Sequence, residues 1–434
     1  MFIYKTFLKN LTIISHMEFG QMSQNLKPKL AKMLLSLGLS MTLLSVSSMA
    51  DSGKARNRKS SLSPELLKKV TKKTYFNPKT AVVRDRDSLD LNLLKSTYAS
   101  WGIDPDNSSS SINLIQAWKN FKKKKDIVVA VIDTGIDPDH PFLKKNIHVL
   151  KGKSSQLNYG LDFSKGKVSV SKPMDNHGHG THVAGIVKSV FPSVKILTLK
   201  YYNRNANGQD NLNSTIEALD YAVNMGVDII NYSGGGPEPD RRELEILKRA
   251  EAKGILVVAA AGNEESNIDN KDNAYYPASY GLKNIITVTA HDQSKRVLSS
   301  SNYGMKTVDI SAPGYRIKSA LPNRRSGYLT GTSQATAFVS GVAALIKSHY
   351  PTITAKQMRM IIKKSAKKEI SLMAKCASGG RLDASKAHTL AAQFTKEANQ
   401  KRGLANKKRA RRDVAQKFNK KTKSTGTIYY RKAN

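Results

Sequence analysis

Three histidines lie within six positions of the sequence, in the stretch "MDNHGHGTHVAGI" over residues 174–186. Imidazole exchanges a proton near neutral pH, and it is also the commonest metal ligand among side chains. His177, His179 and His182 therefore suit either a metal centre or one catalytic base with two bystanders. A metallohydrolase needs further ligands that converge from other loops. Asp175 is available for that role, but no second histidine pair is close in the sequence.

Two other motifs favour acid–base chemistry without a metal. Asp133 ends the β-branched run in "VIDTG", and Ser333 in "GTSQATAFVSGVAALI" opens an apolar helix of small residues. A serine hydroxyl is a weak nucleophile until a base takes its proton, and a carboxylate fixes the tautomer of that base. A helix N-terminus adds free N–H groups beside a developing oxyanion. The amide of Asn263, in "AAAGNEE", would supply a second donor there, although a lone Gly-Asn pair also fits an ordinary turn.

Six motifs follow one another in an order that belongs to a known family: "VIDTGID", "HGTHVAGI", "IINYSGGG", "AAAGNE", "DISAPG" and "GTSQAT". Over roughly residues 98–390 the chain resembles the subtilisin-like serine proteases, in which the Asp precedes the His and the His precedes the Ser. The resemblance implies that Asp133 orients the base, that His179 is the base and later the acid, and that Ser333 is the nucleophile. It also implies that Asn263 donates to the oxyanion together with Ser333.

The same resemblance implies where a peptide substrate lies. Ser233, Gly234 and Gly235 match the segment whose backbone pairs with the bound peptide as an added strand. Gly208 and the residues up to Asp210 are expected to form the opposite edge.

Two further positions bear on specificity. Glu264 is expected at the rim of the main specificity pocket, and Tyr275 at its base, where many relatives have a small residue. A bulky tyrosine shortens the pocket, while a carboxylate at the rim favours a basic side chain. We therefore expect medium or basic side chains before the scissile bond, rather than large aromatic ones.

The proposed chemistry requires no cofactor, and the resemblance implies only a surface that tolerates structural calcium. Many relatives insert a calcium-binding loop after the histidine helix, but here "THVAGIVKSVFPSVKIL" runs directly into the next strand. Phe142 stands where an acidic residue is common. The tight calcium site is therefore expected to be missing. Weak sites in "DPDH" (137–140) and "NIDNKDN" (267–273) stay open, with a solvated loop as the alternative.

The segments around these motifs predict the fold class. Continuous apolar runs, typical of strands buried on both faces, occur at 126–133, 195–202, 227–233, 254–262, 284–290 and 308–314. Helical patterns at 213–226 and 239–254 lie between some of them, and each ends on a glycine. Alternating strands and helices indicate an α/β protein with a mostly parallel sheet. With the resemblance, this predicts the three-layer α/β/α subtilisin-like fold.

The two ends of the chain differ in composition from the middle. Residues 1–50 contain a basic stretch, a short apolar run from Met33 and a small-residue site at Ala50, the pattern of an N-terminal extension with a signal peptide. An uncleaved membrane anchor is the alternative. Residues 51–97 are expected to be a linker or short pro-segment, 98–390 the peptidase domain and 391–434 a basic, disordered tail. The protein is thus expected to be secreted, or to lie in the periplasm or cell envelope.

Charge and cysteine content limit the partners. The net charge of +38 predicts attraction to anionic surfaces and carries no information on fold. Residues 400–434 hold thirteen Lys or Arg against Asp413 alone, which suits contact with an anionic surface or nucleic acid, or a merely solvated tail. A single cysteine, Cys376, excludes an intrachain disulfide. We expect a monomer that acts on proteins or peptides. The alternative is a catalytically impaired subtilase-like binding protein, attached to anionic surfaces by the tail.

Overall fold

The computed structural model describes residues 91–149, 159–164 and 173–424, so the expected signal peptide and all but the last residues, 91–97, of the expected linker or pro-segment lie outside the described residues. Contacts divide the chain into two units, Met1–Val82 and Val83–Asn434, and the elements below belong to the second. Within the described ranges, no helix has an apolar stretch long enough to cross a bilayer.

A nine-stranded sheet lies at the centre of the described fold, in the order β10-β11-β7-β6-β5-β4-β1-β3-β2. Neighbouring strands run parallel except β10 with β11. All six predicted apolar runs contain a strand, because residues buried on both faces leave no polar side to expose. A separate hairpin joins β8 to β9. The strands are β1 (Val128–Asp133), β2 (Gly160–Asp162), β3 (Lys195–Lys200), β4 (Ile229–Tyr232), β5 (Leu256–Ala260), β6 (Ile285–His291), β7 (Ile310–Pro313), β8 (Ile317–Leu321), β9 (Arg325–Leu329), β10 (Lys367–Lys368) and β11 (Gly380–Arg381).

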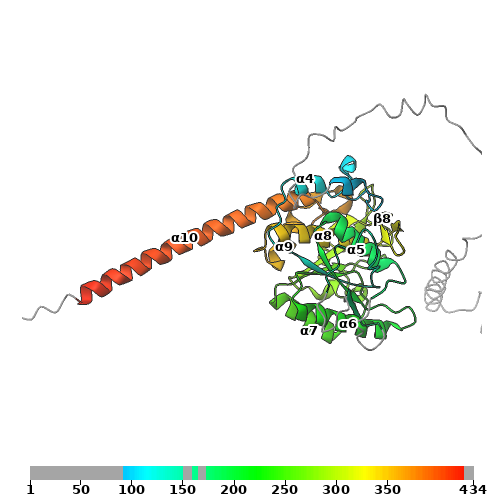
Figure 1. The fold of residues 1–434 in the computed structure, drawn as a ribbon, viewed down its shortest axis with the longest axis horizontal. Helices are drawn as coiled ribbons and strands as arrows, with labels where there is room; N and C mark the ends of the chain where they lie inside the picture. The colour runs from blue at the N-terminus through cyan, green and yellow to red at the C-terminus, as the bar shows by residue number, and fades with distance from the viewer. Residues whose placement is uncertain (1–90, 150–158, 165–172, 425–434) are drawn as a thin grey trace, which may run out of the picture. The chain divides into compact units, whose positions relative to one another are not determined.

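Helices cover both faces of the sheet, which confirms the predicted three-layer α/β/α arrangement. Val129 and Val131 of β1 point into one core with the helices α5 and α8, whereas Ala130 and Ile132 point into a second core with α6 and α7. Figure 1 shows α6 and α7 on the side of the sheet away from α4, α5, α8 and α9. The helices are α4 (Leu114–Lys119), α5 (His179–Val190), α6 (Gly208–Met225), α7 (Arg241–Ala252), α8 (Thr332–His349), α9 (Ala355–Lys364) and α10 (Ala384–Ser424).

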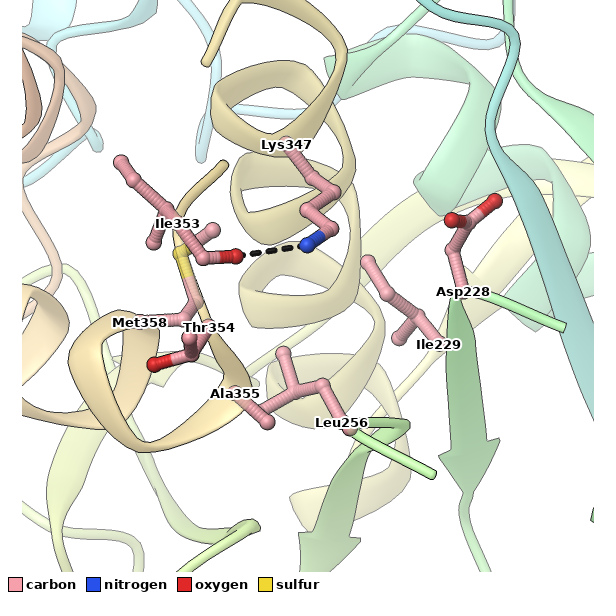
Figure 2. Close-up of a pocket in the computed structure, with 9 residues that line it drawn as sticks. Asp228, Ile229, Leu256, Lys347, Ile353, Thr354, Ala355 and Met358 are labelled. Atoms are coloured by element: carbon pink, nitrogen blue, oxygen red, sulfur yellow. Dashed lines mark hydrogen bonds between the residues drawn. The ribbon is translucent and has the colours of Figure 1, made fainter. Parts of the chain in front are cut away.

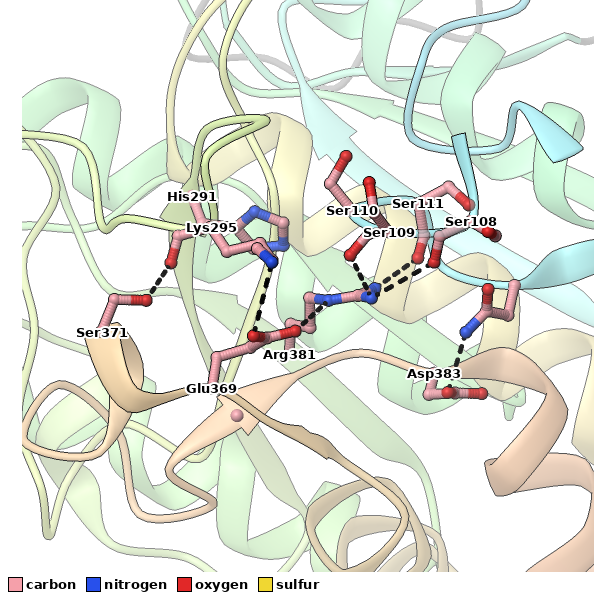
Figure 3. A network of polar contacts seen from close by, with 12 residues as sticks. Ser108, Ser109, Ser110, Ser111, His291, Lys295, Glu369, Ser371, Arg381 and Asp383 are labelled. Carbon is pink, nitrogen blue, oxygen red and sulfur yellow. Dashed lines mark hydrogen bonds and ion pairs between the residues drawn. The ribbon is translucent and has the colours of Figure 1, made fainter. Parts of the chain in front are cut away.

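A buried arginine of β11 forms hydrogen bonds with the segment that precedes α4. Arg381 of β11 is fully buried, and its Nε donates to Oε1 of Glu369 at 3.0 Å. Its terminal nitrogens donate to the carbonyl oxygens of Ser109, at 2.6 Å, and Ser111 (Figure 3). One side chain therefore satisfies a carboxylate and two main-chain carbonyls from a segment about 270 residues away.

The C-terminal region differs from expectation. Residues 391–434 are expected to be disordered, but α10 continues without interruption to Ser424 (Figure 1), so the expectation is wrong up to that residue. The first turns of α10 pack on α4 and α9, with Ala387 and Ala391 buried. Packing supplies the costly nucleus, and a sequence rich in Ala, Lys, Arg and Gln then propagates the helix. From 401 to 416 every residue is exposed, with seven Lys or Arg against Asp413.

A small pocket lies at the amino ends of the central strands, whereas the predicted catalytic residues lie at the carboxyl ends. Asp228 and Leu256 stand at the amino ends of β4 and β5, and Lys347 of α8 donates to the carbonyl oxygen of Ile353 at 2.6 Å (Figure 2). Its volume of about 10 Å³ matches roughly a single water molecule. The pocket is therefore too small to take a substrate side chain.

Candidate active site

Two neighbouring strand ends carry the groups predicted to do chemistry. β1 and β4 pair in parallel with Ile132 opposite Tyr232, so Asp133 and Ser233 are the next residues on each chain. The carboxyl ends of parallel strands meet at one edge of the sheet, about 4.8 Å apart. Side chains anchored on Asp133 and on Ser233 therefore converge.

His179 is anchored on the first of these strand ends. It begins α5, and its Nδ1 lies 2.7 Å from Oδ1 of Asp133, whose side chain is 3% exposed against 23% for His179. Burial opposes the protonated imidazole, but the charge and hydrogen bond of Asp133 outweigh it and raise the pKa of His179 above its ordinary 6.5. Asp133 thus stabilises the imidazolium that a base becomes, and Nε2 is left for proton transfer.

Ser333 is anchored on the second strand end. It lies in the first turn of α8, is buried, and donates from Oγ to the carbonyl oxygen of Ser233 at 3.0 Å. The first N–H groups of a helix have no partner within the helix, so they can donate to a group bound next to Ser333. The fold thus brings a hydroxyl and an Asp-linked imidazole to adjacent strand ends.

Asn263 lies beside the same helix start. Its Oδ1 accepts from the N–H of Thr332 at 3.0 Å and from the Thr332 hydroxyl at 3.2 Å. The residue is exposed, and its amide nitrogen has no protein partner among the described residues. The carbonyl end of the amide is therefore fixed, while the donor end is available to an anion next to Ser333.

Asp175 is a residue whose importance the sequence did not reveal. Its buried carboxylate accepts five hydrogen bonds, which together lower its pKa despite burial. Such a carboxylate fixes the loop that precedes α5 and so positions His179. Its spacing before Gly178 and Thr181 is the signal that could have indicated a loop-capping role. The donors are the N–H groups of His177, Gly178 and Thr181 and the hydroxyls of Thr134 and Thr181.

The other two histidines have separate surroundings. His182 is buried, its Nε2 lies 2.9 Å from the carbonyl oxygen of Ile317, and burial lowers its pKa to about 4. His177 is exposed and lies edge-on to Tyr202, with ring centroids 5.7 Å apart. His182 is therefore a buried hydrogen-bonding residue, and His177 lies at the surface. No group of three His, Cys, Asp or Glu side chains suited to a metal occurs in the part of the chain that is described.

Of the two segments expected to pair with a bound peptide, the one at Ser233–Gly235 has the open main chain that such pairing needs. A side chain at Gly235 would meet the Tyr275 ring and the main-chain oxygen of Tyr276, both at 2.4 Å, so this position requires glycine, whereas one at Gly234 would approach only the Tyr201 hydroxyl, at 2.8 Å. Gly235 is exposed and its main chain makes no hydrogen bond within the described protein, which leaves an open edge after Ser233. Such an edge can accept an extended peptide as an added strand.

The second expected edge is a helix instead. The expectation that Gly208 to Asp210 forms an extended edge is wrong, because these residues make the first turn of α6. Asn207 caps this helix by accepting the N–H of Asp210 at 2.8 Å. The free N–H groups of a first turn point along the helix axis and cannot form a β ladder. Gly208 nevertheless lines a hollow that it shares with Gly235.

Tyr275 fills the space expected for a specificity pocket. Its ring lies against both Gly235 and Gly262, where an added Cβ would meet it at 2.4 and 3.0 Å. The carboxylate of Glu264 accepts from Nδ2 of Asn302 at 2.6 Å, and burial raises the pKa of Glu264. The ring therefore occupies the space beside both glycines, and the Glu264 carboxylate is already engaged by an amide.

The calcium site that the family resemblance implies does not fit these residues. Four residues, 191–194, join α5 to β3, which leaves no room for an inserted loop. Phe142 is buried, and the ammonium of Lys188 lies over its ring, 4.3 Å from the centroid, while donating to the Phe142 carbonyl oxygen. Lys188 therefore places a positive charge beside Phe142, which does not favour a hard cation at this position.

Comparison with known proteins agrees with the fold and the geometry. Residues 124–405 match the subtilase family. The chain is 38% identical over 243 residues to the major intracellular serine protease of Bacillus subtilis (strain 168), across 54% of this chain and 72% of that protein. It is 34% identical over 311 residues to the thermostable alkaline protease of Halalkalibacterium halodurans (70% and 76%), and 35% identical over 246 residues to subtilisin DY of Bacillus licheniformis (55% and 82%).

An α/β sheet that presents serine, histidine and aspartate at one edge is the arrangement of a serine hydrolase, and the matched relatives are serine proteases. The chain belongs to the subtilase family and is a serine endopeptidase. The predicted family and fold class are therefore confirmed.

Proposed function

We propose that peptide bonds are hydrolysed by a unit of Asp133, His179 and Ser333 through an acyl-enzyme. Ser333 Oγ attacks the scissile carbonyl carbon as His179 Nε2 takes the hydroxyl proton, and the C–N bond then breaks as His179 returns that proton to the leaving amine. Water, activated by the same imidazole, hydrolyses the ester and regenerates Ser333. The 2.7 Å contact between His179 and Asp133 is the observation that carries this proposal.

Asn263 is the proposed side-chain donor to the oxyanion. Its side chain is held at the start of α8 by the N–H of the residue before Ser333, Thr332, which donates to Asn263 Oδ1 at 3.0 Å. Donors held in place before the reaction stabilise charge that develops only in the transition state. The chemistry so described draws on side chains and main-chain groups alone.

A fluorophosphonate probe tests this assignment. We expect stoichiometric labelling of Ser333, identified by mass spectrometry, and no labelling of a Ser333→Ala variant. The labelling rate should rise with pH and level off above the pKa of His179, since only neutral imidazole accepts the proton and Asp133 holds that pKa above 6.5. A folded wild-type protein that fails to label would instead indicate the catalytically impaired binding protein.

We also propose that the residue before the scissile bond is medium-sized or basic rather than large and aromatic. Tyr275→Gly should open the space between Gly235 and Gly262 and raise kcat/KM for substrates with phenylalanine at that position by about 10- to 100-fold. Tyr275→Phe keeps the ring and serves as the matched control, with no such gain. Equal preference in wild type and Tyr275→Gly would refute the role of Tyr275.

Export and contact of the basic tail with an anionic surface remain predictions. Export rests on the composition of residues 1–50, and one matched relative is named as intracellular. The tail prediction rests on the exposed positive charges of α10 between 401 and 416.

A further inference from the structure

A hollow of about 420 Å³ lies beside the open edge at Gly235. Gly235 and Gly236 form one wall, and four tyrosines supply much of the remainder. No catalytic side chain lines this hollow, so the chemistry proposed above leaves it unused. The tyrosines are Tyr201, Tyr202, Tyr232 and Tyr276.

Two carboxylates line the hollow, the exposed Glu238 and the buried Glu243. Glu243 is 2% exposed, and its Oε1 accepts a hydrogen bond from the Tyr232 hydroxyl at 2.6 Å. The sequence "DRRE" predicts that Glu243 turns back to cap the N–H of Asp240 at the start of α7. That N–H donates to the Tyr280 hydroxyl at 2.9 Å instead. The Glu243 carboxylate is therefore directed away from the helix start and toward the tyrosines.

Glu243 has no cationic partner among the described residues. The nearby Arg242 pairs with Asp240 at 2.7 Å, and the ion pairs of the described protein do not include Glu243. Burial of a carboxylate without a counter-ion is unfavourable and raises the pKa of Glu243. A cation that entered the hollow would relieve this cost and would also be attracted by the faces of the tyrosine rings.

We propose that this hollow binds a lysine or arginine side chain of the peptide substrate, with Glu243 as its counter-ion. The inference rests on the proposed function, because it assumes that the peptide lies along the edge at Gly235. Ser233 contacts the nucleophile, with its carbonyl oxygen 3.0 Å from Ser333 Oγ. Gly235 and Gly236 follow two and three residues later, roughly 7–10 Å along an extended chain. The selected side chain therefore lies two to four residues before the scissile bond.

Paired peptides test this specificity. Each pair differs only in lysine or norleucine at one of the three positions that lie two to four residues before the scissile bond, with alanine kept immediately before the bond. We expect the wild-type enzyme to favour lysine by about 10- to 100-fold in kcat/KM at one position, since an ion pair made in a partly desolvated site discriminates by that amount. Glu243→Gln keeps an acceptor for the Tyr232 hydroxyl and should remove this preference by lowering kcat/KM for the lysine peptide toward that for the norleucine peptide.

Glu245→Gln is the matched control, because Glu245 lies two residues further along α7 and is exposed. It should retain the lysine preference in full. Hydrolysis of lysine and norleucine peptides at equal rates at every position would overturn this inference and leave the proposed function intact. Failure of the wild-type protein to hydrolyse any peptide would contradict the proposed function itself.

A binding measurement covers the case in which Glu243→Gln fails to fold. Calorimetry on the Ser333→Ala protein compares the same lysine and norleucine peptides without turnover. We expect the lysine peptide to bind about tenfold more tightly or better, with an affinity that falls as salt increases. Equal affinities would overturn the inference.

Discussion

Replacement of His179 with alanine is expected to lower kcat by on the order of 10⁶-fold, the size seen when the corresponding catalytic unit of a related subtilisin is broken. Without the imidazole, Ser333 has no group to take its proton, and Asp133 loses its 2.7 Å partner. Steady-state hydrolysis of a peptide substrate measures the loss. Fluorophosphonate labelling should disappear together with turnover.

His177→Ala is the matched control, since it removes an imidazole two residues away in the sequence. His177 is exposed and contacts Tyr202 edge-on, so kcat should change by no more than about two- to threefold. Thermal unfolding of both variants in a Ser333→Ala background shows whether the fold survives. A large loss in His177→Ala, or an active His179→Ala enzyme, would contradict the assignment of the base.

The largest stability effect is expected at Arg381. Arg381→Met should lower the free energy of unfolding by about 3–5 kcal/mol, because it leaves the Glu369 carboxylate and the carbonyl oxygens of Ser109 and Ser111 without their donor. Urea unfolding of Ser333→Ala proteins measures this without self-digestion. The linear slope with denaturant should stay unchanged, since the surface exposed on unfolding is the same.

Arg249→Met is the control for the same chemical change at the surface. Arg249 pairs with Asp220 at 2.7 Å, but both side chains are more than a third exposed, so the change should be below about 1 kcal/mol. If Arg381→Met were as mild as Arg249→Met, the Arg381 network would not contribute to holding the segment before α4. Comparison of the two variants thus distinguishes the effect of burial on the free energy of unfolding from the effect of an ion pair alone.

Much of the fold could be predicted because its signals are local and periodic. Strands buried on both faces are continuous apolar runs, and six such runs each contain a strand. Gly226 follows α6 with a φ of 65°, a conformation that glycine adopts without strain, so the predicted helix end is confirmed. The short strands β10 and β11 could not be predicted in this way, because two residues are too few to form an apolar run. The pairing of β11 with β7 also joins residues that are distant in the sequence.

The C-terminal helix shows where composition misleads. A basic sequence without an apolar face predicts disorder, because it cannot bury enough surface to offset the entropy of ordering. The first turns of α10 are buried against α4 and α9, with Ala387 and Ala391 in the core. Once those turns are fixed, each added residue gains a hydrogen bond without a new nucleus. Only the tertiary contact at its start decides that this region is helical.

The sequence by itself determined the family and the fold class, and it predicts the reactive side chains. Six motifs in a fixed order lead to the proposal of Asp133, His179 and Ser333, because a nucleophile, a base and an orienting carboxylate are chemically required together. The tertiary structure decided what surrounds them. The five donors to Asp175, the Tyr275 ring between Gly235 and Gly262, and Glu243 facing a tyrosine-lined hollow all join residues that no local pattern relates. Chemistry resides in short motifs, whereas specificity and positioning depend on side chains brought together by the folded chain.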